Sequence, residues 1–319
     1  VHSGSQNLYR AETDAAACIL FTSGTTGTPK AIELTHNNLI WNTMNYSAAL
    51  GMRPDDRELL TTPIYHSAGF GRVFTYIFNG VSVYLCGKFD PMECLRIIQT
   101  EKITALTQPP TLYKMMAAAA GNIAVDTTSV KRAISGASEL DGKTADTIRG
   151  LFPNAAPYNL YGLTEASPGV SILTPGDFEK KPGSLGNPML SVSVAITDPS
   201  GRRLPPGQTG EITCRGPNIM KGYYKQPELT EETIRQGWLR TGDMGYFDPE
   251  GFLFFAGRQK EIIVSGGVNI YPADIETVLL RHPAVAEAAV TAIPAELWGE
   301  SPAAAVVLKQ GLSLIHISE

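Results

Sequence analysis

Residues 22–30 read Thr22-Ser-Gly-Thr-Thr-Gly-Thr-Pro-Lys30, and this is the most informative stretch of the chain. It comes after an apolar run that we expect to be a strand, and we expect a helix to be capped near Thr35. Glycines let backbone N–H groups turn toward an anion, hydroxyls add donors and Lys30 adds charge, so the composition favours a polyphosphate-binding loop. An ordinary turn is the alternative. However, the seven specified residues of the pattern Ser-Gly-Thr-Thr-Gly-x-Pro-Lys would occur together by chance at only about one in 10⁹ starting positions.

The loop is not of the Walker A type. That motif would require Gly at Pro29 and Ser or Thr at Ala31. The sequence therefore predicts a phosphate loop of another class.

Short apolar runs alternate with amphipathic helical stretches from residue 16 to 161. This alternation predicts an α/β fold with a mainly parallel sheet covered by helices. One helix start is well marked, because Asp90 is a good N-cap and Pro91 a good first residue. The strands that we expect are 17–21, 59–62, 81–85, 103–107 and 133–136.

Helix-sized segments disappear after residue 190. Turns such as Asp198-Pro-Ser-Gly201 join short runs, which predicts a small β subdomain over about 185–256. Its expected strands are 192–197, 211–215, 245–247 and 252–255. After Gly257 we expect an α+β domain with a strand at 262–264, a helix opened by Pro272, and strands near 288–292 and 303–308.

These patterns predict a large domain over 1–258 and a truncated small domain over 259–311. We interpret 312–319 as a candidate artefactual tail. The basic residues are scattered and the net charge is −5, which argues against a nucleic-acid partner and for a small molecule. No apolar run reaches the roughly 18–20 residues of a membrane span, so we expect no integral membrane segment.

Four cysteines show neither a CxxC pattern nor a Cys/His metal spacing. They are Cys18, Cys86, Cys94 and Cys214. We therefore expect free thiols in a reducing compartment, which indicates a cytoplasmic protein.

Further motifs come after the loop in a fixed order. They are Pro63-Ile-Tyr-His66-Ser-Ala-Gly69, Asn159-Leu-Tyr-Gly-Leu-Thr-Glu165, Gly210-Glu211 with Gly216-Pro217 and Gly222-Tyr223, Thr241-Gly-Asp243, and Gly257-Arg-Gln-Lys260 with Ser265-Gly-Gly267. Together with Ser23–Lys30, this series resembles the adenylate-forming (AMP-binding) superfamily of acyl-CoA synthetases, peptide-synthetase adenylation domains and beetle luciferases.

The resemblance implies an enzyme that activates a carboxylic acid with ATP and Mg²⁺ and passes the acyl group to coenzyme A, releasing AMP and pyrophosphate. The stretch from Glu261 to Pro272 and the apolar residues around His66 look most like fatty or aromatic acid–CoA ligases. A peptide-synthetase-type adenylation domain and a truncated, non-catalytic nucleotide-binding paralogue remain alternatives.

The resemblance also implies roles for single residues around the nucleotide. Thr164 would contact the α-phosphate and Glu165 would bind Mg²⁺. The alternative for Glu165 is a solvent-exposed acid that caps a helix and has no role in binding. Asp243 would hold the ribose hydroxyls with Arg258, or the two could be ordinary surface charges. The phosphates would be held by Thr22, Ser23, Gly24, Thr25, Thr26, Gly27 and Lys30, and the adenine by Gly136, Ala137, Tyr161 and Gly162; a buried core tyrosine is the alternative for Tyr161.

By the same resemblance, His66 would orient the acyl carboxylate and gate the acyl pocket. A satisfied core histidine is the alternative. Lys260 would be the hinge about which the small domain turns between the two half-reactions. Gly266 and Gly267 would let the pantetheine arm of coenzyme A pass, or would simply form a tight turn.

The chain also departs from the family pattern. Ala31 replaces the glycine that usually follows the loop lysine, and Lys309 with Gly311 does not reproduce the family's C-terminal Gly-Lys motif with its catalytic lysine. The family also has a substantial segment before its phosphate loop. We therefore expect this chain to be a fragment that is inactive by itself.

Overall fold

The computed structural model describes residues 11–22, 29–121, 123–136, 140–265, 268–295 and 299–309. The chain divides into two compact units. Unit 1 comprises Val1–Val194, Thr213–Arg240 and Glu250–Leu253, and unit 2 comprises Ala195–Ile212, Thr241–Pro249 and Phe254–Glu319.

A mainly parallel sheet forms the centre of unit 1, as the alternation of apolar and amphipathic segments predicts. Five parallel strands lie in the order β4 (Ser82–Leu85), β3 (Arg57–Leu60), β5 (Ala105–Gln108), β6 (Arg132–Gly136) and β7 (Ala156–Gly162). Two antiparallel strands, β8 (Gly169–Leu173) and β9 (Ser184–Pro188), continue the sheet beyond β7. The α/β fold prediction is confirmed.

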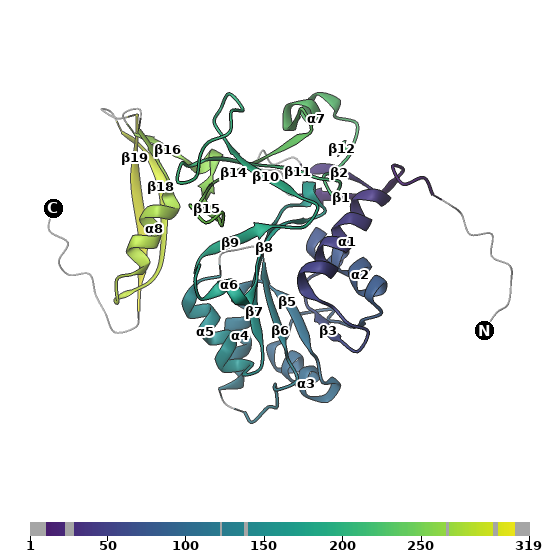
Figure 1. Ribbon diagram of the computed structural model, residues 1–319. Helices are drawn as coiled ribbons and strands as arrows, with labels where there is room; N and C mark the ends of the chain where they lie inside the picture. The colour runs from purple at the N-terminus through teal and green to yellow at the C-terminus, as the bar shows by residue number, and fades with distance from the viewer. Residues whose placement is uncertain are drawn as a thin grey trace. The chain divides into compact units, whose positions relative to one another are not determined.

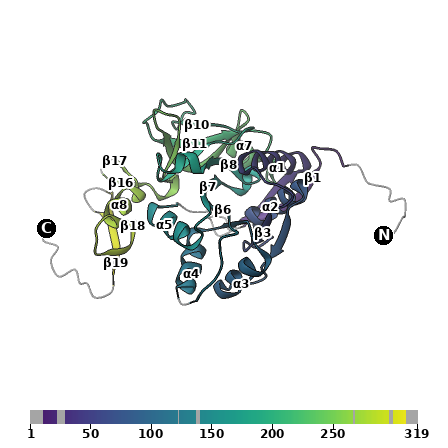
Figure 2. The same cartoon turned by 60° about the horizontal axis from the view of Figure 1, so that its bottom comes forward.

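Helices cover both faces of this sheet, because successive side chains of a strand point to opposite sides. Leu60 and Ile134 join a buried cluster with residues of α1 (His36–Leu50) and α2 (Ser67–Asn79). Their neighbours Leu59 and Ala133 join a second cluster. That cluster includes residues of α3 (Pro91–Glu101), α4 (Pro110–Ala120) and α5 (Gly142–Leu151), and Figures 1 and 2 show the two groups of helices apart from each other.

The glycine- and threonine-rich loop comes between two strands in the chain, and the second of them, which precedes the helix expected after Thr35, was not among the predicted strands. β1 (Ala16–Thr22) and β2 (Lys30–Thr35) are antiparallel, and β12 (Gly222–Tyr223) pairs with β2. Ile32 and Leu34 are buried on alternate positions of β2, which is the pattern of a strand. Thr35 does cap α1: its hydroxyl accepts from the backbone N–H of Asn38, and the Asn38 side chain accepts in return.

The expected strands between residues 192 and 258 are all present. They are β10 (Ser193–Thr197), β11 (Gly210–Arg215), β14 (Trp238–Phe247) and β15 (Leu253–Arg258), adjacent in this order. β14 begins at Trp238 rather than at Gly245 and pairs with β13 (Ile234–Arg235). Two short helices, α6 (Pro175–Phe178) and α7 (Pro227–Thr233), lie in unit 1.

Near the C-terminal end, the described part of unit 2 contains a separate antiparallel sheet and one α-helix. Its strands are β16 (Ile263–Ser265), β17 (Val268–Ile270), β18 (Val285–Ala295) and β19 (Gly299–Leu308), in the order β17-β16-β19-β18. Helix α8 (Pro272–Leu280) begins at the predicted proline, and its Glu276 accepts a hydrogen bond of 2.8 Å from the N–H of Val290 on β18. The domain boundary after residue 258 stays a prediction.

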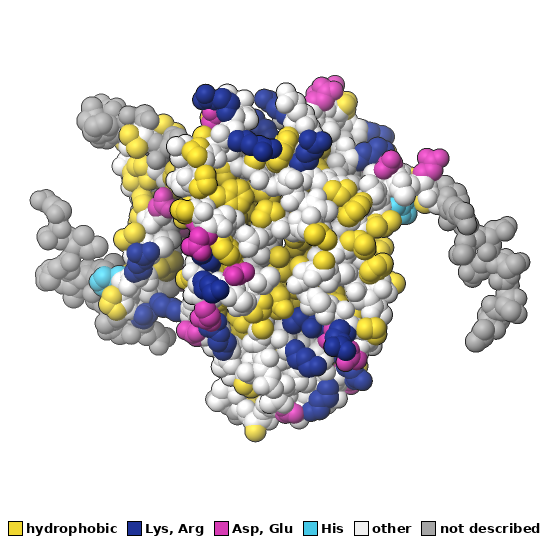
Figure 3. All heavy atoms as spheres, viewed as in Figure 1, with side chains coloured by type: hydrophobic (Ala, Val, Ile, Leu, Met, Phe, Trp, Pro, Cys, Tyr) yellow, Lys and Arg dark blue, Asp and Glu magenta, His cyan; other side chains and the backbone are white. Residues whose placement is uncertain are grey.

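The cysteines are free, as predicted. Burial raises the pKa of the Cys18 thiol to about 11, and burial with a contribution from Cys86 raises the pKa of Cys94 to about 12. None of the helices in the described ranges has the length and apolar character that crossing a bilayer requires. On the face drawn in Figure 3, Lys and Arg side chains are spread among acidic and hydrophobic ones.

Candidate functional site

Four of the predicted site residues of unit 1 lie in segments at the carboxyl ends of the parallel strands. Gly136 is the last residue of β6 and pairs with Leu160 of β7, so Tyr161 comes next at the same edge. His66 lies in the connection that leaves β3, and Thr164 comes shortly after β7. The carboxyl ends of parallel strands are where ligands bind in open α/β sheets.

A hydrogen bond joins the His66 motif to the Thr164 motif. Ser67 Oγ and Thr164 Oγ1 lie 3.0 Å apart, and either hydroxyl can donate. Ser67 is buried at the start of α2, and Thr164 begins the short 3-10 helix η1 (Thr164–Ala166). Ser67 was not among the predicted site residues, although its place directly after His66 was the available signal.

His66 is the N-cap of α2 and its side chain is exposed, so the alternative of a buried core histidine is wrong. Its Nδ1 accepts a hydrogen bond of 3.2 Å from the backbone N–H of Ala68. A neutral imidazole whose Nδ1 accepts carries its proton on Nε2. His66 can therefore donate from Nε2 to an anionic group.

Gly69 explains the end of the Pro-x-x-His-x-x-Gly motif. A Cβ at this position would lie 2.3 Å from the carbonyl oxygen of Pro63, so any side chain would push α2 away from the segment that precedes it. Glycine at position 69 thus allows the first turn of α2, which follows His66, to pack closely against Pro63.

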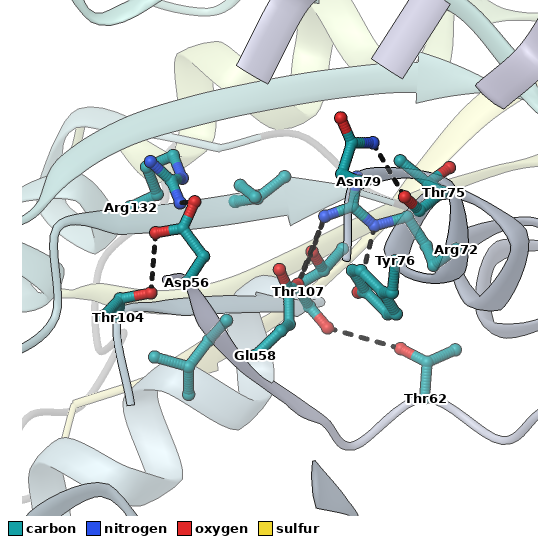
Figure 4. Close-up of polar contacts among 12 residues, drawn as sticks. Asp56, Glu58, Thr62, Arg72, Thr75, Tyr76, Asn79, Thr104, Thr107 and Arg132 are labelled. Carbon is teal, nitrogen blue, oxygen red and sulfur yellow. Dashed lines mark hydrogen bonds and ion pairs between the residues drawn. The ribbon is translucent and has the colours of Figure 1, made fainter. Parts of the chain in front are cut away.

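A buried polar network holds α2 against the sheet (Figure 4). Arg72 donates from Nη2 to Glu58 Oε1 on β3 at 3.2 Å and to Thr107 Oγ1 on β5 at 2.9 Å. Its Nε donates to the Tyr76 hydroxyl at 3.2 Å. These contacts anchor the helix that places His66 and Ser67.

Glu165, Tyr223 and Lys30 form a contiguous group from η1, β12 and β2. The Tyr223 hydroxyl donates to Glu165 Oε1 at 3.0 Å, and Lys30 Nζ lies 5.1 Å from the centroid of the Tyr223 ring. Burial, and then the charge and hydrogen bond of Glu165, raise the pKa of Tyr223 well above its ordinary value, against an opposing effect of Thr233. The hydroxyl therefore stays protonated and acts as a donor. The sequence placed Tyr223 in a motif but indicated no role for it.

The turn that carries Glu165 is fixed from several sides. A Cβ on Gly162 would lie 1.9 Å from the carbonyl oxygen of Pro168, so glycine is required where the turn closes. The fully buried Asn218 donates from Nδ2 to the carbonyl oxygens of Ala166 and Gly169, each at 2.8 Å. Nothing in the sequence pattern distinguished Asn218 from a surface asparagine.

Asp243 and Arg258 come together in unit 2. Arg258 Nε lies 3.5 Å from Asp243 Oδ1, with exposed side-chain fractions of 54% and 14%. The backbone N–H of Asp243 donates to Thr241 Oγ1 at 3.1 Å, which fixes the turn before it. The pair therefore presents a mostly buried carboxylate beside an exposed guanidinium.

Two family models match most of the chain. The AMP-binding enzyme family model matches residues 4–224, and that of the AMP-binding enzyme C-terminal domain matches residues 274–318. The chain belongs to the AMP-binding enzyme family. The sequence-based assignment to this superfamily is confirmed.

Two characterised relatives of this AMP-binding chain are acid–CoA ligases by name. The chain is 38% identical over 299 residues to a feruloyl-CoA synthase from Amycolatopsis sp, covering 93% of this chain and 60% of that protein. It is 35% identical over 306 residues to a 2-succinylbenzoate–CoA ligase from Bacillus licheniformis, covering 96% and 63%.

Solved AMP-binding enzymes share the fold. The o-succinylbenzoate coenzyme A synthetase from Bacillus subtilis, in complex with ATP and magnesium ion, is 33% identical with a TM-score of 0.85, covering 95% of this chain and 62% of that one. ATP-bound MatB from Rhodopseudomonas palustris is 33% identical with a TM-score of 0.87, covering 95% and 60%. The chain thus spans about 60% of the length of the proteins that it matches.

The residues of this AMP-binding chain fit a magnesium ion that arrives with a nucleotide. Within the described ranges, no group of three or more His, Cys, Asp or Glu side chains could hold a metal by itself. Mg²⁺ is usually bound through one or two carboxylates together with substrate phosphates and water. Glu165 suits this, because among the described residues only the Tyr223 hydroxyl engages its carboxylate, at Oε1.

Of the remaining predicted site residues, some lie within the described ranges and others do not. Thr22 and Lys30 are paired across β1 and β2, so the two ends of the loop lie side by side. Lys260 is exposed in the 3-10 helix η2 (Gln259–Glu261). The predictions for Ser23, Gly24, Thr25, Thr26, Gly27, Ala137, Gly266 and Gly267 lie outside the described residues.

Proposed function

We propose that the protein that contains these residues is an AMP-forming acid–thiol ligase. It would activate a carboxylic acid with ATP and Mg²⁺ to an acyl-adenylate and then transfer the acyl group to coenzyme A. The observation that supports this best is the connected series His66–Ser67, Thr164–Glu165 and Tyr223–Lys30, in which hydroxyl donors, a cation and a carboxylate lie together.

Adenylation requires a carboxylate to approach the α-phosphate of ATP, so the site must offset repulsion between anions. We assign the Nε2–H of His66 to the acyl carboxylate and the Thr164 hydroxyl to the α-phosphate. Lys30 supplies positive charge to the phosphates at the end of the loop. Glu165 would hold the magnesium ion, which would supply positive charge to the phosphates.

We assign the substrate to the fatty or aromatic carboxylic acids. The names of the relatives support this class, since they include a feruloyl-CoA synthase, an indoleacetate–CoA ligase and a long-chain-fatty-acid–CoA ligase. Asp243 with Arg258 is assigned to the ribose of the nucleotide, and Gly266 with Gly267 to the passage of coenzyme A. The free cysteines support a cytoplasmic location.

The test is an assay of the purified full-length protein with ATP, Mg²⁺, coenzyme A and a panel of aromatic and fatty acids. We expect acid-dependent release of AMP and formation of an acyl-CoA, both separated by chromatography. Omission of coenzyme A should leave acid-dependent exchange of pyrophosphate into ATP. Exchange with amino acids only would identify an amino-acid-activating enzyme instead, and no exchange with any acid would contradict the proposal.

A further inference from the structure

Tyr223 lies between the two charged groups of the nucleotide site. Its hydroxyl donates to Glu165 Oε1 at 3.0 Å, and its ring lies 5.1 Å from Lys30 Nζ. We propose that Tyr223 is a positioning residue that aims the Glu165 carboxylate at the divalent metal bound with the nucleotide. This inference rests on the function proposed above.

Tyr223 is itself held rigidly. Its strand β12 pairs with β2, with Tyr223 opposite Ile32, and its backbone N–H donates to Thr230 Oγ1 at 2.9 Å. The next N–H, of Tyr224, donates to the carbonyl oxygen of Ala31 at 2.8 Å. With 6% of its surface exposed, the Tyr223 side chain has little freedom to move. It can therefore act as a fixed reference for the carboxylate.

The hydrogen bond from Tyr223 restricts the carboxylate of Glu165, and a second hydrogen bond restricts its backbone. The N–H of Met220 donates to the carbonyl oxygen of Glu165 at 2.8 Å. In the part of the chain that the structure describes, no hydrogen bond or ion pair engages the other carboxylate oxygen, Oε2. A carboxylate fixed at one oxygen offers the other as a single, directed ligand.

A neutral donor is suited to this task. A Lys or Arg partner would orient the carboxylate too, but would offset the negative charge that attracts a metal cation. The tyrosine hydroxyl orients Glu165 and leaves its charge in place. Among the described residues Lys30 forms no ion pair, and its ammonium instead lies over the aromatic ring. Lys30 thus stays available to phosphate and Glu165 to metal.

The experiment compares wild type with Tyr223→Phe in the full-length protein. Phenylalanine keeps the ring, its packing and its contact with Lys30, and removes only the hydroxyl. Mn²⁺ occupancy in the presence of ATP is measured by electron paramagnetic resonance, and ATP affinity by calorimetry in Mg²⁺ and in EDTA. We expect metal affinity to fall about 10-fold or more, as for other residues that orient metal ligands, with ATP affinity in EDTA unchanged.

Tyr84→Phe is the matched control. The Tyr84 hydroxyl donates to Glu101 Oε2 at 2.8 Å, so this variant also loses a tyrosine–glutamate hydrogen bond, but one between β4 and α3. Its Mn²⁺ occupancy should equal that of wild type. In a Glu165→Ala background, Tyr223→Phe should have no further effect on metal affinity, because the side chain that it orients is gone.

The outcomes separate this inference from the proposed function. If wild type binds ATP and Mn²⁺ and Tyr223→Phe does so with unchanged metal affinity, the positioning role is overturned and the ligase function stands. If Tyr223→Phe weakens metal binding equally with and without Glu165, the hydroxyl acts elsewhere and the role is also overturned. A wild-type protein that binds no ATP with either metal would overturn the proposed function, and this inference with it.

Discussion

Arg72 Nη2 and Glu58 Oε1 lie 3.2 Å apart in an ion pair whose side chains are only 1% and 0% exposed. The Thr107 hydroxyl donates to the same oxygen at 2.6 Å (Figure 4). Arg72 Nη1 and Glu58 Oε2 have no hydrogen-bond partner among the described residues. Each buried charge is therefore compensated mainly by the other. Removal of one would leave the other as an unpaired charge in the protein interior, which is unfavourable.

Arg72→Met should lower the free energy of unfolding by about 3–5 kcal/mol, because it leaves the Glu58 carboxylate buried and unpaired. Urea unfolding followed by circular dichroism measures the change. The double variant Arg72→Met/Glu58→Leu should recover much of the loss, since no charge is then buried. A double variant whose loss equals the sum of the two single losses would show that the ion pair is not the cause.

Asp56 should make the stability of the protein depend on pH. It accepts from the N–H of Arg53 at 2.8 Å and from Thr104 Oγ1 at 3.0 Å, and it forms an ion pair with Arg132. Burial alone would raise the pKa of Asp56, but Arg132 and these donors bring it below its ordinary value. A lowered folded-state pKa stabilises the fold above the unfolded pKa of about 3.9, and this contribution is lost as the pH falls through the folded pKa.

Asp56→Asn should therefore be less stable than wild type at pH 7, and the difference should shrink as the pH is lowered below about 4. Urea unfolding at several pH values measures it. Asp55→Asn is the control, because Asp55 pairs with Arg53 at the surface with 73% of its side chain exposed. Its effect should be within about 0.5 kcal/mol at every pH. A stability difference for Asp56→Asn that does not change with pH would contradict the assignment.

Glu165→Ala should lower Mg²⁺-dependent adenylate formation in the full-length protein by about 10²-fold or more, because the metal loses its protein carboxylate. Acid-dependent pyrophosphate exchange measures this half-reaction. The melting temperature should remain close to that of wild type, since Glu165 is partly exposed. Glu228→Ala, on the exposed first turn of α7, is the control with unchanged exchange. Wild-type exchange in Glu165→Ala would remove the metal role.

Lys260→Pro should reduce thioester formation far more than adenylate formation. Proline fixes φ at about −65°, so it hampers a backbone rotation between the two half-reactions. Acyl-CoA formation and pyrophosphate exchange are measured on the same preparation. Lys260→Ala, which keeps the backbone free to rotate, should retain the ratio of the two rates. Equal loss of both half-reactions in the proline variant would mean that Lys260 is not a hinge.

Local patterns allowed much of the fold to be predicted. The caps at Thr35 and Asp90 depend on residues within one helical turn, and Asp90 accepts from the N–H of Glu93 at 2.9 Å as expected. Of the five parallel strands, four (β3, β4, β5 and β6) were predicted from their apolar runs, and β7 was not. The predicted strand 17–21 is β1, which pairs antiparallel with β2 and does not join the parallel sheet. The strand from Lys30 to Thr35 was missed, because a short strand between a loop and a helix has few residues in which to display alternation.

The candidate site residues could be predicted from the order of the motifs. The residues that hold them in place by hydrogen bonds could not. Ser67 meets Thr164 across 97 positions, and Tyr223 meets Glu165 across 58. Asn218 reaches Ala166 across 52 positions. A lone Ser, Tyr or Asn in a sequence window has no periodicity that marks a distant partner, so sequence reasoning had no signal for these pairs.

The sequence by itself determined many of the elements, the family and the chemical types available at the site, because caps, alternation and motif spacing are properties of neighbouring residues. Only the tertiary structure decided that Lys30 lies over the ring of Tyr223 instead of beside Glu165, and that Arg72 is buried against Glu58. Which cation meets which anion depends on how β2, β3, β12 and α2 pack. Packing is set by the whole buried surface of unit 1, to which each local pattern contributes only a part.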